Sequence, residues 1–162
     1  MTEDTTLALD DAAQYLNREL ALLRFQERVL EEAQDATNPL LERAKYLAIF
    51  SSNLSEFYMV RVAGLKQQIA AEVGGLSDDG LTAAEQLAAV RERVPEMLAA
   101  ARECFVDIRA GLAAAGIRLL DYAELDDAQR AIADAYYSSD VFPVLTPLAF
   151  DPGRPFPHIS NL

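Results

Sequence analysis

Apolar residues recur at helical spacing along most of this 162-residue chain, and the longest such pattern runs through residues 39–73. At 100° per residue, one face of this segment collects mostly apolar positions, namely Leu40, Ala44, Leu47, Ser51, Leu54, Tyr58, Val62, Leu65 and Ile69. A second face holds Tyr46, Phe50, Asn53 and Phe57. Because a helix that is apolar on two faces is buried on two sides, the pattern predicts a central helix of a bundle.

Helix-start signals place three more helices around this one. The predicted helices span residues 11–34, 39–73, 82–115 and 126–139. Three of them open at a capping-box spacing, Asp11/Gln14, Thr82/Glu85 and Asp126/Gln129, and the fourth opens at Asn38-Pro39, where Asn caps and Pro occupies the first helical position. The pattern therefore predicts a mainly α protein, an antiparallel bundle of three long helices with a shorter fourth.

Glycine and proline punctuate these helices. Residues 74–80 read as a loop, Pro95 predicts a kink in the third helix, and Gly116 ends that helix. The short apolar run 117–120 fits either a strand or a connector. Residues 141–162 contain five prolines, a density that no helix survives, so they are expected to be extended and poorly packed without a partner.

Two polar side chains, Glu19 and Gln26, interrupt the apolar arc of the first helix. We interpret them as buried polar groups satisfied by a neighbouring helix rather than as catalytic groups. Asn53, in the middle of an aromatic stripe, has two interpretations. The amide could read the edge of a flat heterocycle while the rings supply stacking area, or it could cap a backbone group inside a core helix.

Charge and composition narrow the function classes. The formal net charge of −12 disfavours binding to nucleic acid and to anionic membranes, and no apolar run reaches the roughly 20 residues that span a bilayer. The single cysteine, Cys104, and the single histidine, His158, form neither a disulfide nor a zinc site. Cys104 is expected to be a packed thiol and His158 a loop or strand residue. The acidic N-terminus lacks a signal peptide, and the cytoplasm is the expected compartment.

Catalytic motifs are missing from the chain. Gly74-Gly75 is not followed by the Lys-Ser/Thr of a phosphate-binding loop, and neither an HExxH motif nor a paired-cysteine motif occurs. We therefore predict no catalytic and no metal-binding residue in this chain.

Five stretches resemble the N-terminal part of bacterial polyphosphate kinases: YLNREL (15–20), FQERVLEEA (25–33), NPLLERAKYLAIFSSNLSEFYMVRVAGLK (38–66), VFPVLTPLAFDP (141–152) and PFPHISNL (155–162). This family transfers the γ-phosphate of ATP to inorganic polyphosphate and back. The resemblance implies a flexible tail over 1–10, a helical N-terminal domain over 11–122, and the incomplete start of an α/β head domain over 123–162.

In that family, two further C-terminal domains carry the phosphorylated histidine, the phosphate-binding residues and the magnesium-binding residues. The resemblance therefore implies ATP, ADP and polyphosphate as ligands of the full-length enzyme, with Mg²⁺ bound outside this chain. It also implies a homo-oligomer, and association with a membrane through the rest of the protein stays open. One site residue carries over: the asparagine of the motif resembled by SSNLSEFY contacts adenine in the family, and it falls on Asn53.

The sequence departs from the family pattern at two places near this motif. Ser55 stands where the family commonly has Asp, and residues 21–25 lack the usual Ser-Trp pair. A different class of function also fits the apolar stripes, namely a non-enzymatic helical module for interaction or dimerisation. Under either reading the isolated chain is expected to have no kinase activity.

Overall fold

The computed structural model describes residues 11–153, 155 and 156. Residue contacts divide the chain into two compact units, Met1–Leu112 and Ala113–Leu162, and each is described by itself. No strand occurs in the described ranges, and an isolated β-bridge joins Leu76 and Thr82. The predicted mainly α fold is therefore confirmed, and the run 117–120 is a connector.

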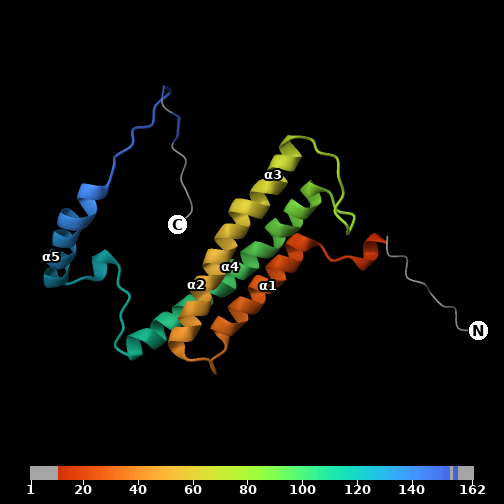
Figure 1. Ribbon diagram of the computed structural model, residues 1–162. Helices are drawn as coiled ribbons and strands as arrows, with labels where there is room; N and C mark the ends of the chain where they lie inside the picture. Colours follow the sequence, from red (N-terminus) through yellow and green to blue (C-terminus); the bar gives the residue numbers. More distant parts are fainter. Residues whose placement is uncertain (1–10, 154, 157–162) are drawn as a thin grey trace, which may run out of the picture. The chain divides into compact units, whose positions relative to one another are not determined.

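In the first unit, three helical rods lie side by side (Figure 1). The first rod is α1 (Arg18–Gln34), and the third is α4 (Ala83–Ala114). The second rod is continuous and consists of α2 (Leu40–Phe57), a π-helical turn (Tyr58–Val62) and α3 (Ala63–Ala70). Each rod runs antiparallel to the one before it in the chain, as the bundle prediction requires, so α1 and α4 run in the same direction (Figure 1).

The core fills the space between the rods. Its buried apolar residues are Leu23, Leu30, Ala33, Leu47, Phe50, Leu54, Phe57, Val62, Leu65, Ala83, Leu87, Val90, Val94, Met97, Cys104, Ile108 and Leu112. Cys104 is a buried free thiol whose pKa is raised by burial, in agreement with the prediction of a packed side chain. Helix α4 continues through Pro95, which is exposed.

One buried stripe, rather than two buried faces, runs along the second rod. Phe50 and Phe57 from one predicted face and Leu47 and Leu54 from the other are buried together, whereas Tyr58 is 41% exposed. The expectation of burial on two sides is therefore wrong. The π-helical turn contributes to the difference because its wider turn carries the buried stripe from Phe57 to Val62 and leaves Tyr58 exposed, although the uniform 100° projection places Tyr58 on the buried face.

The first helix begins later than predicted. Asp11 accepts a hydrogen bond from the Ala13 N–H, yet this cap supports only a 3₁₀ turn (Ala12–Gln14). Α1 begins after Asn17, whose Oδ1 accepts from the backbone N–H of Glu19 at 3.0 Å and of Leu20 at 3.1 Å. The predicted start near residue 11 is wrong because Asn17 offers a cap that satisfies two backbone donors at once.

Of the three other predicted N-terminal caps, two form as expected and one does not. Thr82/Glu85 and Asp126/Gln129 form the predicted capping boxes. Asn38 does not accept from the helix that follows; its Nδ2 donates to the Glu32 carbonyl at 2.9 Å, at the end of α1. Gly116 has a φ of +86° just after α4, where a left-handed residue ends a helix as predicted.

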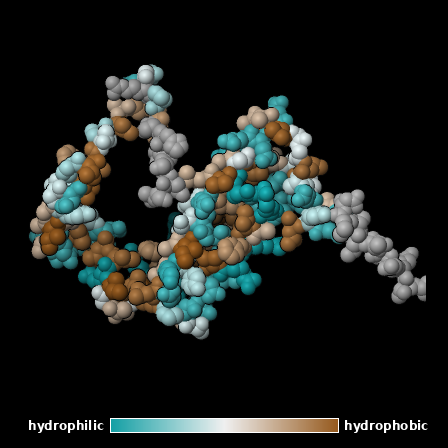
Figure 2. Space-filling model, viewed as in Figure 1, coloured by the Kyte–Doolittle hydropathy of each residue, from teal (hydrophilic) through white to brown (hydrophobic). Residues whose placement is uncertain are grey.

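The second unit is small and apolar on its surface. It contains a 3₁₀ turn (Tyr122–Glu124), α5 (Asp127–Tyr136), a π-helical turn (Tyr137–Val141) and a second 3₁₀ turn (Phe142–Val144). None of its described residues is buried, and Figure 2 shows hydrophobic colour along it. Its exposed large apolar residues include Ile132, Tyr136, Phe142, Val144, Leu148, Phe150 and Phe156. The predicted tail thus starts later, after Val144, and His158 lies outside the described residues.

Within the described residues, no helix is both long and apolar enough to cross a membrane.

Candidate functional site

A depression of about 300 Å³ lies between α1 and the second rod. Three segments line it: α1, the end of α2 and the π-helical turn. The lining residues are Leu22, Phe25, Gln26, Asn53, Glu56, Phe57, Val60 and Arg61. The volume is at the lower end of the range for small-molecule sites, and the mixture of apolar surface with a few polar groups is typical of them.

Asn53 and Gln26 meet at this depression. The Asn53 Nδ2 donates to Gln26 Oε1 across the two helices at 3.0 Å. Gln26 is 7% exposed, and Asn53 is half-buried. The interpretation of Gln26 as a buried group satisfied by a neighbouring helix is confirmed. Among the described residues, the Asn53 side chain forms no hydrogen bond to a backbone group. Its partner is another side chain, that of Gln26.

The aromatic surroundings of Asn53 differ from those expected from its helix alone. Phe50 is 1% exposed and belongs to the core, so its ring cannot stack on a ligand. Phe57 lines the depression but is also largely buried. The accessible ring is that of Phe25 on α1, which is 58% exposed. The sequence signal that could have pointed to this ring is that Phe25 directly precedes Gln26, a polar residue in the apolar arc of the same helix.

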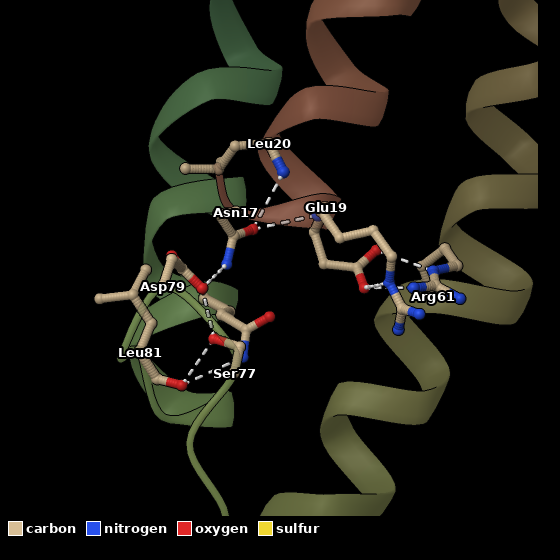
Figure 3. A network of polar contacts seen from close by, with 9 residues as sticks. Asn17, Glu19, Leu20, Arg61, Ser77, Asp79 and Leu81 are labelled. Atoms are coloured by element: carbon tan, nitrogen blue, oxygen red, sulfur yellow. Dashed lines mark hydrogen bonds and ion pairs between the residues drawn. The ribbon is translucent and has the colours of Figure 1, made fainter. Parts of the chain in front are cut away.

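Arg61, one of the residues that line the depression, forms an ion pair with the buried Glu19 (Figure 3). Arg61, in the π-helical turn, donates through Nε to Glu19 Oε2 at 2.8 Å, and its Nη2 donates to Glu19 Oε1. The Glu19 side chain is 5% exposed, and the hydrogen bonds to it raise the pKa of Arg61. This pairing satisfies Glu19 through a neighbouring helix, as predicted, and fixes a guanidinium beside the depression.

The start of α1 is fixed by a second set of contacts, also drawn in Figure 3. Asn17 Nδ2 donates to Asp79 Oδ1 at 3.2 Å. Ser77 Oγ lies 2.6 Å from the same carboxylate oxygen and 2.9 Å from the Leu81 carbonyl. The predicted loop 74–80 is therefore tied to the beginning of α1, which in turn positions Glu19 toward Arg61.

A larger depression of about 430 Å³ lies between α1 and α4. Four of its lining residues are charged, and one of them, Arg93, contacts Glu96 at 2.8 Å and also contacts Glu27, outside the depression. Its surface is about half polar, whereas that of the smaller depression is mainly apolar. We therefore take the smaller depression, with its amide pair and exposed Phe25, as the candidate binding site.

The side chains around the depression suit a planar ligand. Its lining residues include no serine, threonine, cysteine or histidine, and the described part of the chain contains no group of three His, Cys, Asp or Glu side chains able to hold a metal ion. Apolar side chains can cover the faces of a planar ring, while amide and guanidinium groups offer donors and an acceptor to its edge.

Comparisons with known proteins give the family. The family model for the polyphosphate kinase N-terminal domain matches residues 15–120, and the model for the polyphosphate kinase middle domain matches residues 128–162. The chain is 47% identical over 156 residues to polyphosphate kinase 1 of Chlorobaculum tepidum, covering 95% of this chain and 22% of that protein. It is 52% identical over 149 residues to the polyphosphate kinase of Mycolicibacterium gilvum, covering 91% and 20% respectively.

A solved polyphosphate kinase structure is also similar to this chain. The crystal structure of polyphosphate kinase from Porphyromonas gingivalis superposes with a TM-score of 0.66 at 34% sequence identity, covering 88% of this chain and 20% of that one. The chain thus spans about a fifth of the length of the relatives it matches. These matches and the helical fold agree with the resemblance carried by the motifs, and the chain belongs to the polyphosphate kinase family, over its N-terminal domain and the beginning of its middle domain.

Proposed function

We propose that this chain is the N-terminal part of an enzyme that reversibly transfers the γ-phosphate of ATP to inorganic polyphosphate, and that its first unit holds the adenine of ATP. The observation that carries the proposal is the position of Asn53. Its amide lines the apolar depression between α1 and α2, and it occupies the motif position to which the family resemblance assigns an adenine contact.

The net charge of the chain supports a role in holding the base rather than the phosphates. Phosphoryl transfer requires cations around the phosphates, commonly Mg²⁺ together with Arg or Lys side chains. A chain with a net charge of −12 is poorly suited to that task, but it can bind the uncharged base at the other end of the nucleotide. Mg²⁺, the polyphosphate and the phosphorylated nucleophile therefore belong to the rest of the enzyme, and residues 1–162 alone are expected to be inactive.

Oligomer contacts are a second role for the chain. The described part of the second unit exposes large apolar residues, among them Phe142 and Phe150, which are more than 60% exposed. Surfaces of this kind mark sites of association. A non-enzymatic interaction module would use them in the same way. The coding sequence distinguishes the two: a reading frame that continues for several hundred codons favours the enzyme, and a stop codon after Leu162 favours the module.

The test of the adenine site is steady-state kinetics of the complete enzyme. Asn53→Ala removes a hydrogen bond to the base, which is worth about 0.5–1.5 kcal/mol, so the KM for ATP should rise about two- to ten-fold. The rate constant kcat should change less, because the γ-phosphate lies far from the base. Gln68→Ala truncates an exposed amide on α3, in the same rod; it is the matched control and should leave KM unchanged.

An unchanged KM in Asn53→Ala would contradict the proposal. So would a variant that loses stability without a change in ATP dependence, which urea unfolding curves would reveal. Either result would return Asn53 to a structural role.

A further inference from the structure

Gln26 is a buried amide between apolar residues on the core-facing side of α1. Leu23 and Leu30, on the same side of the helix, are 1% and 4% exposed, and Gln26 is 7% exposed. A leucine at this position would bury more apolar surface without a polar group to satisfy. The one hydrogen bond recorded for the Gln26 side chain is accepted from Asn53. Gln26 thus contacts the residue to which we assign base recognition.

The hydrogen-bonding inventory of Asn53 explains what this contact achieves. An asparagine side chain has two N–H donors and one carbonyl acceptor. One N–H is committed to Gln26 Oε1 at 3.0 Å. The described part of the structure records no partner for the other N–H or for Oδ1, and both are available at the depression. One donor beside one acceptor complements the edge of adenine, which presents its amino group beside a ring-nitrogen acceptor.

Building on the proposed function, we propose that Gln26 is a positioning residue that fixes the orientation of the Asn53 amide, so that the site selects 6-aminopurine over 6-oxopurine nucleotides. The contact opposes a 180° turn of the Asn53 amide, because Gln26 would have to turn with it. A turned amide would place Asn53 Oδ1 against Gln26 Oε1, two acceptors without a proton between them. Gln26 itself does not need to touch the base.

A 6-oxopurine is the informative competitor. It carries an acceptor at position 6, where adenine carries a donor, so Asn53 would have to turn to bind it. Such a turn becomes possible when Gln26 is replaced by a side chain without an acceptor, or when Gln26 turns as well and presents its Nε2. A carboxylate at position 26 has acceptors only, so it keeps Asn53 in the orientation that reads adenine.

The experiment compares ATP and ITP as substrates of the complete enzyme. Gln26→Met keeps the side-chain length but removes the hydrogen bond; it should raise the KM for ATP about two- to ten-fold and lower the preference for ATP over ITP. Gln26→Glu keeps the acceptor and should retain the preference. In an Asn53→Ala background, Gln26→Met should produce no further rise in KM, because Gln26 acts through Asn53.

The outcomes separate this inference from the proposal on which it rests. If Asn53→Ala leaves the KM for ATP unchanged, the adenine site itself is refuted. If Asn53→Ala raises KM but Gln26→Met changes neither KM nor the ATP/ITP preference, the positioning role alone is overturned. An equal effect of Gln26→Met with and without Asn53, or equal loss of preference in Gln26→Glu, overturns it as well. Urea unfolding of each variant shows that the compared enzymes are folded.

Discussion

Arg61→Met is the most informative test of how the first unit is held together. The substitution keeps an unbranched side chain that can pack like the aliphatic stem of Arg61, but it removes the two donors to Glu19. Glu19 stays behind at the start of α1 with a side chain that is 5% exposed. A buried carboxylate without its partner retains the desolvation cost and loses the compensating charge.

The expected magnitude follows from the surroundings of the pair. Breaking a buried ion pair by removing one partner costs about 3–5 kcal/mol. The lower end, about 3 kcal/mol, applies because the Arg61 side chain is 28% exposed and because Arg18 Nε lies 3.5 Å from Glu19 Oε1. Arg28→Met breaks the exposed pair with Glu31, whose side chains are 79% and 65% exposed, and should cost about 0–0.5 kcal/mol.

Urea unfolding of the chain, followed by circular dichroism, measures both free energies of unfolding. The double variant Glu19→Met/Arg61→Met should be more stable than Arg61→Met, because it also removes the stranded charge. The reasoning is refuted if Arg61→Met is as mild as Arg28→Met, or if the double variant loses the sum of the two single losses.

Three further predictions concern the helix ends and the second unit. Asn17→Ala should lower the free energy of unfolding by about 1–2 kcal/mol in urea titrations, because it removes the cap of α1 and the contact to Asp79; a loss near zero would contradict the cap. The Thr82 backbone N–H and hydroxyl hold the pKa of Glu85 below its usual value of 4.5, so the resulting stabilisation is present above pH 4.5 and is lost as pH falls through the lowered folded pKa. Between about pH 6 and about pH 3, the difference in free energy of unfolding between the unmodified chain and Glu85→Gln should decrease as the pH falls. A difference that stays constant over this range would refute the prediction. Amide hydrogen exchange in residues 145–153 should be rapid, since Leu148 and Phe150 are 68% and 67% exposed, and strong protection in a monomer would contradict the expectation.

Sequence reasoning could identify which polar groups of α1 need partners, but not which partners they find. Glu19 and Gln26 interrupt an apolar arc, and burial of an unpaired polar group is costly enough that a partner could be predicted. The partners, Arg61 and Asn53, lie 42 and 27 residues away. Only the packing of the second rod against α1 determines those pairs.

Periodicity also could not show which side of a helix faces the core. The 100° projection placed Phe50, Asn53 and Phe57 on one face, but it could not show that the two rings enter the core while the amide remains at the surface. That division depends on the rotation of the rod against its neighbours. The ring accessible at the depression, Phe25, comes from another helix, so no pattern within residues 38–73 could indicate it.

The most direct test of adenine recognition is a crystal structure of the complete enzyme with a non-hydrolysable ATP analogue. We expect the adenine edge within hydrogen-bond distance of the Asn53 amide, one ring face against the apolar side chains around Phe25, and the bond from Asn53 to Gln26 intact. An analogue bound with its base away from this depression, or with Asn53 turned toward the core, would contradict the account.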